Sequence, residues 1–91
     1  MNVTLAEAKE YLRIDGNDED TTVENILNAA YNLCADISRL TEEEFDNAGD
    51  VAKIAVLYAV GYFYEHREDA NHHELTLTLR SLLFGIRREE F

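Results

Sequence analysis

Residues 15–20, DGNDED, place five oxygen-bearing side chains within six positions, which is enough oxygen to hold a calcium ion. A calcium loop of the EF-hand type also needs a glycine at its sixth position and a bidentate glutamate at its twelfth. Counted from Asp15, those positions hold Asp20 and Ile26, and a start at Asp18 fits less well. Acids at a helix start also accept hydrogen bonds from free N–H groups and complement the helix dipole. We therefore interpret the stretch as a boundary between two helices and predict no metal site.

The histidines and the single cysteine match no catalytic or metal-binding pattern. His66, His72 and His73 lie without the cysteine pair or the H-E-x-x-H spacing that zinc sites use. Cys34 stands among apolar residues, which is typical of a small buried side chain in a reducing compartment rather than of a nucleophile. The four glycines are isolated, so no phosphate-binding loop and no G-x-S-x-G motif is present. The sequence predicts no enzyme, no catalytic residue and no cofactor.

Size and charge point to protein partners. A chain of 91 residues is expected to form one domain, residues 1–91, near the lower size limit for a stable core, and such a domain gains from oligomerisation. Nineteen acids against eight bases give a net charge of −11, which opposes adhesion to nucleic acid or to an anionic membrane. The longest apolar run, residues 54–64, is shorter than the roughly 20 residues of a bilayer span, and no signal peptide is expected.

The apolar spacing predicts an all-α fold, a small bundle of four to five helices. Thr4 and Glu7 form a capping-box pattern that opens a helix through about Leu12 or Arg13, and Gly16 is expected to end it in the left-handed conformation. A second helix is expected from about residue 20 to 40, because apolar residues recur on one face at helical spacing: Val23, Ile26, Leu27, Ala30, Leu33, Cys34, Ile37 and Leu40.

The third helix is the most apolar one. After a polar connector, residues 41–50, in which Phe45 looks buried and a short helical turn can form, Asp50 is expected to cap a helix from Val51 to about Arg67. Its residues are apolar nearly all round, so other helices or neighbouring subunits must cover most of its circumference. Gly61 weakens a helix by about 1 kcal/mol relative to alanine, and its presence indicates a close helix crossing.

The last segment, LTLTLRSLLFGIRREEF, fits two periods. Leucines at 75, 77 and 79 alternate as in a strand, whereas apolar residues at 75, 79, 82, 83 and 86 share one helical face. The longer pattern, and the lack of a partner strand, favour a helix to about Phe84. We expect the tail, about residues 85–91, to be flexible.

Two segments carry a resemblance to a known family. LAEAKEYLRIDGNDEDTTVENILNAAYNLC resembles the opening of the tailed-phage head-tail connector family, also described as DNA packaging proteins, in its L-x-E-A-K-x-Y-L-R-I-D block, its acidic stretch and its following helix. AVLYAVGYFYEHRED is similar to the family's aromatic third helix, with the Tyr-Glu-x-Arg signature at residues 64–67. The chain lacks the proline that often precedes that helix, and residues 78–81 keep only the central pair of a Gln-Leu-Arg-Gly motif.

The resemblance implies a structural head-completion adaptor rather than an enzyme. Such an adaptor assembles into a ring of about a dozen copies, docks on the portal protein, extends the DNA channel and offers a surface to the next head-completion or tail protein. It would lie in the virion, at the head-tail junction, after assembly in the bacterial cytoplasm. Its acidic channel wall would let DNA pass without specific binding.

Aromatic and basic residues near the C-terminal half are the candidate contacts between subunits. The candidate interface residues are Tyr58, Tyr62, Tyr64, Arg67, Arg80, Arg87 and Arg88. Basic residues in an otherwise acidic chain would suit head-to-tail contacts, in which the acidic side of one copy meets the basic tail of the next. Arginines that complement a helix dipole and tyrosines that fill the core explain the same pattern without any assembly.

Two other functions remain open from the sequence. The first is a small acidic regulator, monomeric or dimeric, that binds a basic protein surface. It would be favoured if the acids clustered on one convex face and the third helix were fully buried within one subunit. The second is a metal-dependent enzyme, which predicts heat or stabilisation on titration with divalent cations.

Overall fold

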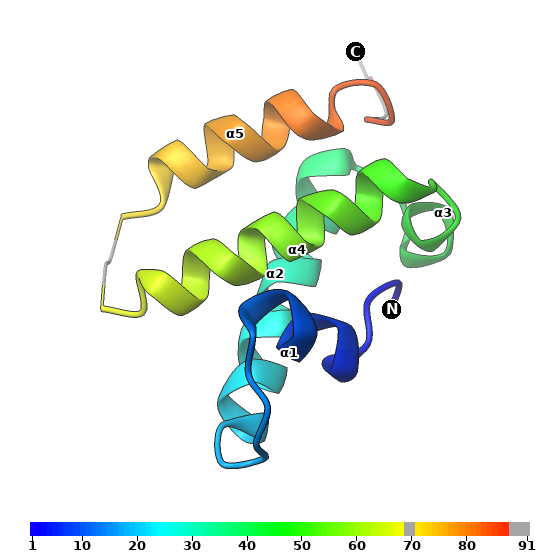
Figure 1. The fold of residues 1–91 in the computed structure, drawn as a ribbon. Coiled ribbons are helices and arrows are strands. Elements are labelled where there is room, and N and C mark those ends of the chain that lie inside the picture. The colour runs from blue at the N-terminus through cyan, green and yellow to red at the C-terminus, as the bar shows by residue number, and fades with distance from the viewer. Residues whose placement is uncertain (69–70, 88–91) are drawn as a thin grey trace.

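Five helices make up the part of the chain that the computed structural model describes, residues 1–68 and 71–87. They are α1 (Leu5–Leu12), α2 (Asp20–Ser38), α3 (Glu42–Asp46), α4 (Asp50–Glu65) and α5 (His73–Leu83), as Figure 1 shows. The predicted all-α fold is confirmed, and the alternating leucines of residues 75–79 belong to a helix.

The helices are arranged around α2 and α4. Helix α4 packs across α2, and α5 packs on both while it runs antiparallel to α4 (Figure 1). Helix α1 packs on α2 and α4 and lies on the opposite side of α4 from α5 (Figure 1). The short α3 packs against α2 near the start of α4. Helix α4 therefore has neighbours on several sides, but no described element covers all of it.

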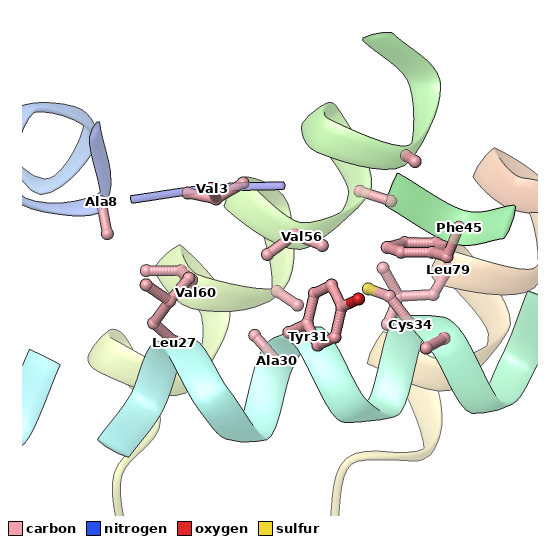
Figure 2. Packing of buried hydrophobic residues seen from close by; sticks show 14 of the residues in the cluster. Val3, Ala8, Leu27, Ala30, Tyr31, Cys34, Phe45, Val56, Val60 and Leu79 are labelled. Atoms are coloured by element: carbon pink, nitrogen blue, oxygen red, sulfur yellow. The ribbon is translucent and has the colours of Figure 1, made fainter. Parts of the chain in front are cut away.

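Small side chains of α4 form the middle of the core. The buried positions of α4 are only alanine and valine, which let the backbone of this helix approach α2 and α5 closely. Figure 2 shows Val56 and Val60 of α4 above Leu27 and Ala30 of α2. The buried apolar cluster draws on all five helices and on the N-terminal segment: Val3, Ala8, Val23, Leu27, Ala30, Tyr31, Cys34, Ala35, Phe45, Ala52, Ala55, Val56, Ala59, Val60, Leu75, Leu79 and Leu83.

The segment between α2 and α4 contributes a buried aromatic ring, as expected. Thr41 and Glu44 form a capping box that opens α3, and this single turn carries Phe45 into the core with no exposed surface. The Phe45 ring meets Tyr31 edge to face, with centroids 5.6 Å apart. The Tyr31 hydroxyl donates a hydrogen bond of 2.7 Å to Asp46. Helix α3 therefore adds one aromatic residue to the core and binds Tyr31 through Asp46.

The first helix begins and ends where predicted, but a different residue ends it. Thr4 and Glu7 make both hydrogen bonds of the capping box. The last helical residue is Leu12, and the C-cap Arg13 adopts the left-handed conformation at φ 61°, whereas Gly16 does not have a positive φ. The expected role of Gly16 is wrong, because Ile14 packs against the core and the chain must already turn at Arg13 to return it there.

The boundaries of α2 and α4 differ from those predicted by a few residues. Helix α2 ends at Ser38, with Arg39 left-handed at φ 60°. Gly49, at φ 89°, caps α4, so Asp50 is its first helical residue and not its cap. Glycine adopts a positive φ at little cost, and an acid in the first turn still complements the dipole. Helix α4 ends at Glu65, before the predicted Arg67.

The segment after α5 forms a turn against the core. The Ile86 N–H donates to the Leu83 carbonyl at 3.0 Å, and the Ile86 side chain is partly buried against the core. The expected flexible tail starts within this turn, and its residues 88–91 lie outside the described part of the chain.

Candidate interaction surface

Tyr64 and Arg67 lie in a polar cluster with Glu19 at the end of α4. The Tyr64 hydroxyl donates to the Glu19 carboxylate, 3.0 Å from both of its oxygens. The Arg67 guanidinium lies 4.8 Å from the Tyr64 ring centroid and 3.9 Å from a Glu19 oxygen. The hydrogen bond to Glu19 raises the pKa of Tyr64. The cluster joins the last turn of α4 to the residue that precedes α2, so both predicted interface residues have a partner within one subunit.

Tyr62 belongs to a second, aromatic cluster that joins α4 to the start of α5. Its ring stacks on His66 with centroids 4.2 Å apart and meets His72 edge to face at 5.7 Å. Phe63 also meets His72 edge to face, at 5.0 Å. These contacts hold the two antiparallel helices together at this end, so Tyr62 has a structural role within the subunit.

The Tyr11 side chain of α1 packs on α4 at Gly61, where the sequence predicts a close helix crossing. A Cβ on Gly61 would lie 3.1 Å from a carbon of the Tyr11 ring, which confirms the expected crossing. Beside this contact lies a groove of about 670 Å³. Its lining includes all three predicted tyrosines: Tyr11, Leu12, Arg13, Tyr58, Gly61, Tyr62, Tyr64, Glu65 and His66.

One side of α4 remains exposed and apolar. Val51, Ile54 and Tyr58 follow each other at helical spacing and are 43%, 56% and 41% exposed. We call these three residues the α4 face. The exposed acid Asp50 directly precedes Val51, and the exposed Glu65 lies about two helical turns after Tyr58 on the same side of α4. The only base of α4, Lys53, forms an ion pair with Glu7 of α1, so the α4 face is apolar with an acidic border.

Helix α5 has a second exposed apolar surface on the side opposite its buried leucines. Leu77 and Phe84 are 49% and 71% exposed, and the exposed Arg80 lies between them at the same helical spacing. We call these three residues the α5 face. The half-buried Arg87 follows it in the C-terminal turn. The α5 face is therefore apolar with the basic Arg80 at its centre, while the exposed Glu74 lies one turn before it and Arg87 one turn after it. Arg88 lies outside the described residues.

The acids and the cysteine show no catalytic arrangement in the described ranges. Asp20 forms an ion pair of 2.7 Å with Lys9, and Glu19 binds Tyr64, so two of the acids that raised the calcium question have protein partners. Across residues 1–68 and 71–87, no group of three or more His, Cys, Asp and Glu side chains is placed to hold a metal ion. Cys34 is fully buried, and burial raises the pKa of its thiol to about 12.

A family comparison identifies the chain. The family model described as "Phage gp6-like head-tail connector protein" matches residues 2–89. The chain belongs to this family. Searches of curated proteins and of solved structures give no match to the connector.

Family membership gives the connector a structural role in the phage particle and contacts with other head or tail proteins. The match includes all five helices and both exposed faces. No helix in the described ranges combines the length and the apolar composition needed to span a bilayer.

The predicted interface residues of the connector fall into two groups at opposite ends of the α4 and α5 pair. Tyr58, Tyr62 and Tyr64 line one groove, with Arg67 beside it. Because α5 runs antiparallel to α4, Arg80 and Arg87 lie toward the start of α4 instead (Figure 1). Within one subunit, the three tyrosines and Arg67 therefore lie apart from Arg80 and Arg87.

Sequence reasoning did not select several exposed residues of the connector: Tyr11, Val51, Ile54, Leu77 and Phe84. A signal was available for Leu77, because it lies outside the apolar stripe that defines α5 as a helix. No comparable signal exists for Val51 and Ile54, since every side of α4 is apolar and only the packed fold determines which side is covered.

Proposed function

We propose that the connector assembles into a closed ring of about a dozen copies, docks on the portal protein at the capsid vertex and extends the DNA channel toward the tail. The observation that carries the proposal is the presence of two exposed apolar faces on a small domain. Large apolar side chains that one subunit leaves in water gain free energy when a neighbour covers them. A domain of 91 residues buries only a small core, so it has little stability with which to offset the cost of this exposure.

The charge of the connector supports a channel that DNA crosses without being held. A net charge of −11 repels the phosphate backbone, so DNA could slide past the subunits with no specific contact. One end of the ring would bind the portal protein, and the other would receive the next head-completion or tail protein. The ring would form in the bacterial cytoplasm and remain at the head-tail junction of the virion.

The exposure of α4 argues against the alternative of a monomeric acidic regulator. The sequence predicted that this function would be favoured if α4 were fully buried within one subunit, whereas Ile54 is 56% exposed. Acidic residues also border an apolar face here, an arrangement that suits protein packing more than binding to a wholly basic surface.

The test is assembly of the purified connector with and without its portal protein. Sedimentation velocity over a range of protein concentrations should show a large oligomer, and negative-stain microscopy should show rings, alone or on portal particles. A connector that stays monomeric at every concentration, and that neither binds the portal nor forms rings with it, would contradict the proposal.

A further inference from the structure

We infer that the α4 face of one copy packs against the α5 face of the next copy in the assembly. The inference rests on the proposed function, since it concerns the contact by which copies of the chain join. It names a second copy of this chain as the occupant of both faces. The contact is heterologous, which means that each copy contributes two different surfaces.

The two faces match in length and in residue spacing. Val51, Ile54 and Tyr58 follow the spacing i, i+3, i+7, and so do Leu77, Arg80 and Phe84. At 1.5 Å of rise per residue, each face extends about 10 Å along its helix. Both faces therefore present one short row of side chains, which is the unit that packs between two helices.

Charge decides which faces meet. Asp50 adjoins the α4 face and Glu65 lies about two turns beyond it on the same side of α4, while the neighbouring Lys53 forms an ion pair with Glu7. Two α4 faces in contact would bring these acids together without a compensating base. An α5 face instead brings a base, Arg80, into the contact.

The α5 face carries the opposite charge. Arg80 lies within it and Arg87 follows it, while the exposed Glu74 is the one acid of α5. Two α5 faces would place their arginines against each other. Like charges across an interface are unfavourable, so the pairing of the α4 face, with its neighbouring acids, and the α5 face, with Arg80 at its centre, is favoured.

The position of the faces suits a ring. Helices α1 and α5 lie on opposite sides of α4 (Figure 1). The α5 face lies on the side of α5 away from its buried leucines, and the residues of both faces are exposed, so the two faces of one copy do not cover each other. A pair joined by one α4–α5 contact keeps one free face of each kind, so further copies can add until the assembly closes.

The test uses two variants, each of which blocks one of the two faces. Ile54→Glu disrupts the α4 face and Phe84→Glu disrupts the α5 face, and both positions are exposed, so each variant should keep its helicity by circular dichroism. Asn28→Glu, on the exposed polar side of α2, is the matched control for added negative charge. Tyr58→Glu and Leu77→Glu form a second pair, which protects the test against misfolding of one variant. Each face variant should lower the association constant at least about thirtyfold, and the control should not.

Mixing gives the decisive result. Ile54→Glu retains an intact α5 face and Phe84→Glu retains an intact α4 face, so an equimolar mixture should form a dimer of one copy of each and nothing larger. If the wild type assembles but either variant assembles equally well, or the mixture forms no dimer, the α4–α5 contact is wrong while the ring proposal stands. If the wild type stays monomeric at every concentration and forms no ring on the portal, both are wrong.

Discussion

The ring of Tyr11 packs directly on the backbone of Gly61, where a Cβ would come within 3.1 Å of it. This contact sets how closely α1 approaches α4. Tyr11 is nevertheless 49% exposed, so its ring has room to move outward by a few tenths of an ångström. Position 61 can therefore hold a slightly larger residue, such as alanine, if the Tyr11 ring moves outward.

Gly61→Ala should raise the free energy of unfolding by about 0.5 kcal/mol. Alanine gains about 1 kcal/mol over glycine in a helix interior, and displacement of the Tyr11 ring offsets part of that gain. Urea denaturation measures the change. In a Tyr11→Ala background the same substitution should give the full gain, about 1 kcal/mol. Equal effects in the two backgrounds would show that the ring does not constrain the site.

The stability of the connector should fall as pH rises above the ordinary tyrosine pKa of about 10. The hydrogen bond to Glu19 raises the pKa of Tyr64, and burial together with the hydrogen bond to Asp46 raises that of Tyr31. Above the ordinary value the folded chain keeps protons that the unfolded chain has lost, so the free energy of unfolding decreases with pH. Below about pH 10 this contribution is fully present. Urea denaturation at a series of alkaline pH values measures it.

Glu19→Gln isolates the part that belongs to Tyr64. Without the carboxylate, Tyr64 should ionise closer to its ordinary pKa, which near-ultraviolet absorbance of the folded protein detects. Tyr64→Phe removes the ionisation of Tyr64, so comparison with this variant identifies which part of the absorbance change belongs to Tyr64. An ionisation profile that Glu19→Gln leaves unchanged would count against the contact between these residues.

Local signals predicted the parts of the fold that depend on few residues. The capping box at Thr4 and Glu7 and the burial of Phe45 were both predicted, since each follows from residue types a few positions apart. Gly16 and Asp50 were assigned the wrong roles in ending or capping a helix. Their assignments depended on where Ile14 packs and on the positive φ of Gly49, which only the tertiary structure determines.

The candidate surface was less predictable than the fold. The apolar composition of α4 indicated that something must cover it, but not that Val51 and Ile54 would stay exposed while Ala55 and Val56 are buried. Tyr64 looked like a free contact residue from sequence because its partner Glu19 is 45 positions away. Long-range pairing of this kind leaves no trace in local spacing.

Cys34 should react with thiol reagents only when the connector unfolds. Its side chain has no exposed surface, and burial raises its pKa to about 12, so the reactive thiolate is scarce and inaccessible in the folded state. The extent to which Cys34 reacts with an aromatic disulfide, measured by the absorbance of the released aromatic thiolate at a series of urea concentrations, should follow the unfolding transition. Rapid labelling without urea, with helicity intact, would show an accessible thiol.

The combined change of Asp18, Glu19 and Asp20 to Asn, Gln and Asn should destabilise the connector and leave its response to divalent cations unchanged. The change removes the ion pair of 2.7 Å between Asp20 and Lys9 and the carboxylate that binds Tyr64. Partly exposed contacts of this kind are worth about 0.5 to 1 kcal/mol each, so the free energy of unfolding should fall by roughly 1 to 2 kcal/mol. Thermal unfolding with and without calcium or magnesium measures both effects.

A second triple variant separates contacts from charge. Glu24→Gln, Asp36→Asn and Glu43→Gln also remove three negative charges, from exposed positions outside the loop. Because the chain carries a net charge of −11, this control should leave stability unchanged or raise it slightly by reducing repulsion. Loss of stability in the loop variant alone would then come from the Lys9 and Tyr64 contacts. If calcium stabilised the wild type and not the loop variant, the DGNDED stretch would be a metal site after all, since only ligand loss would abolish a cation-dependent shift.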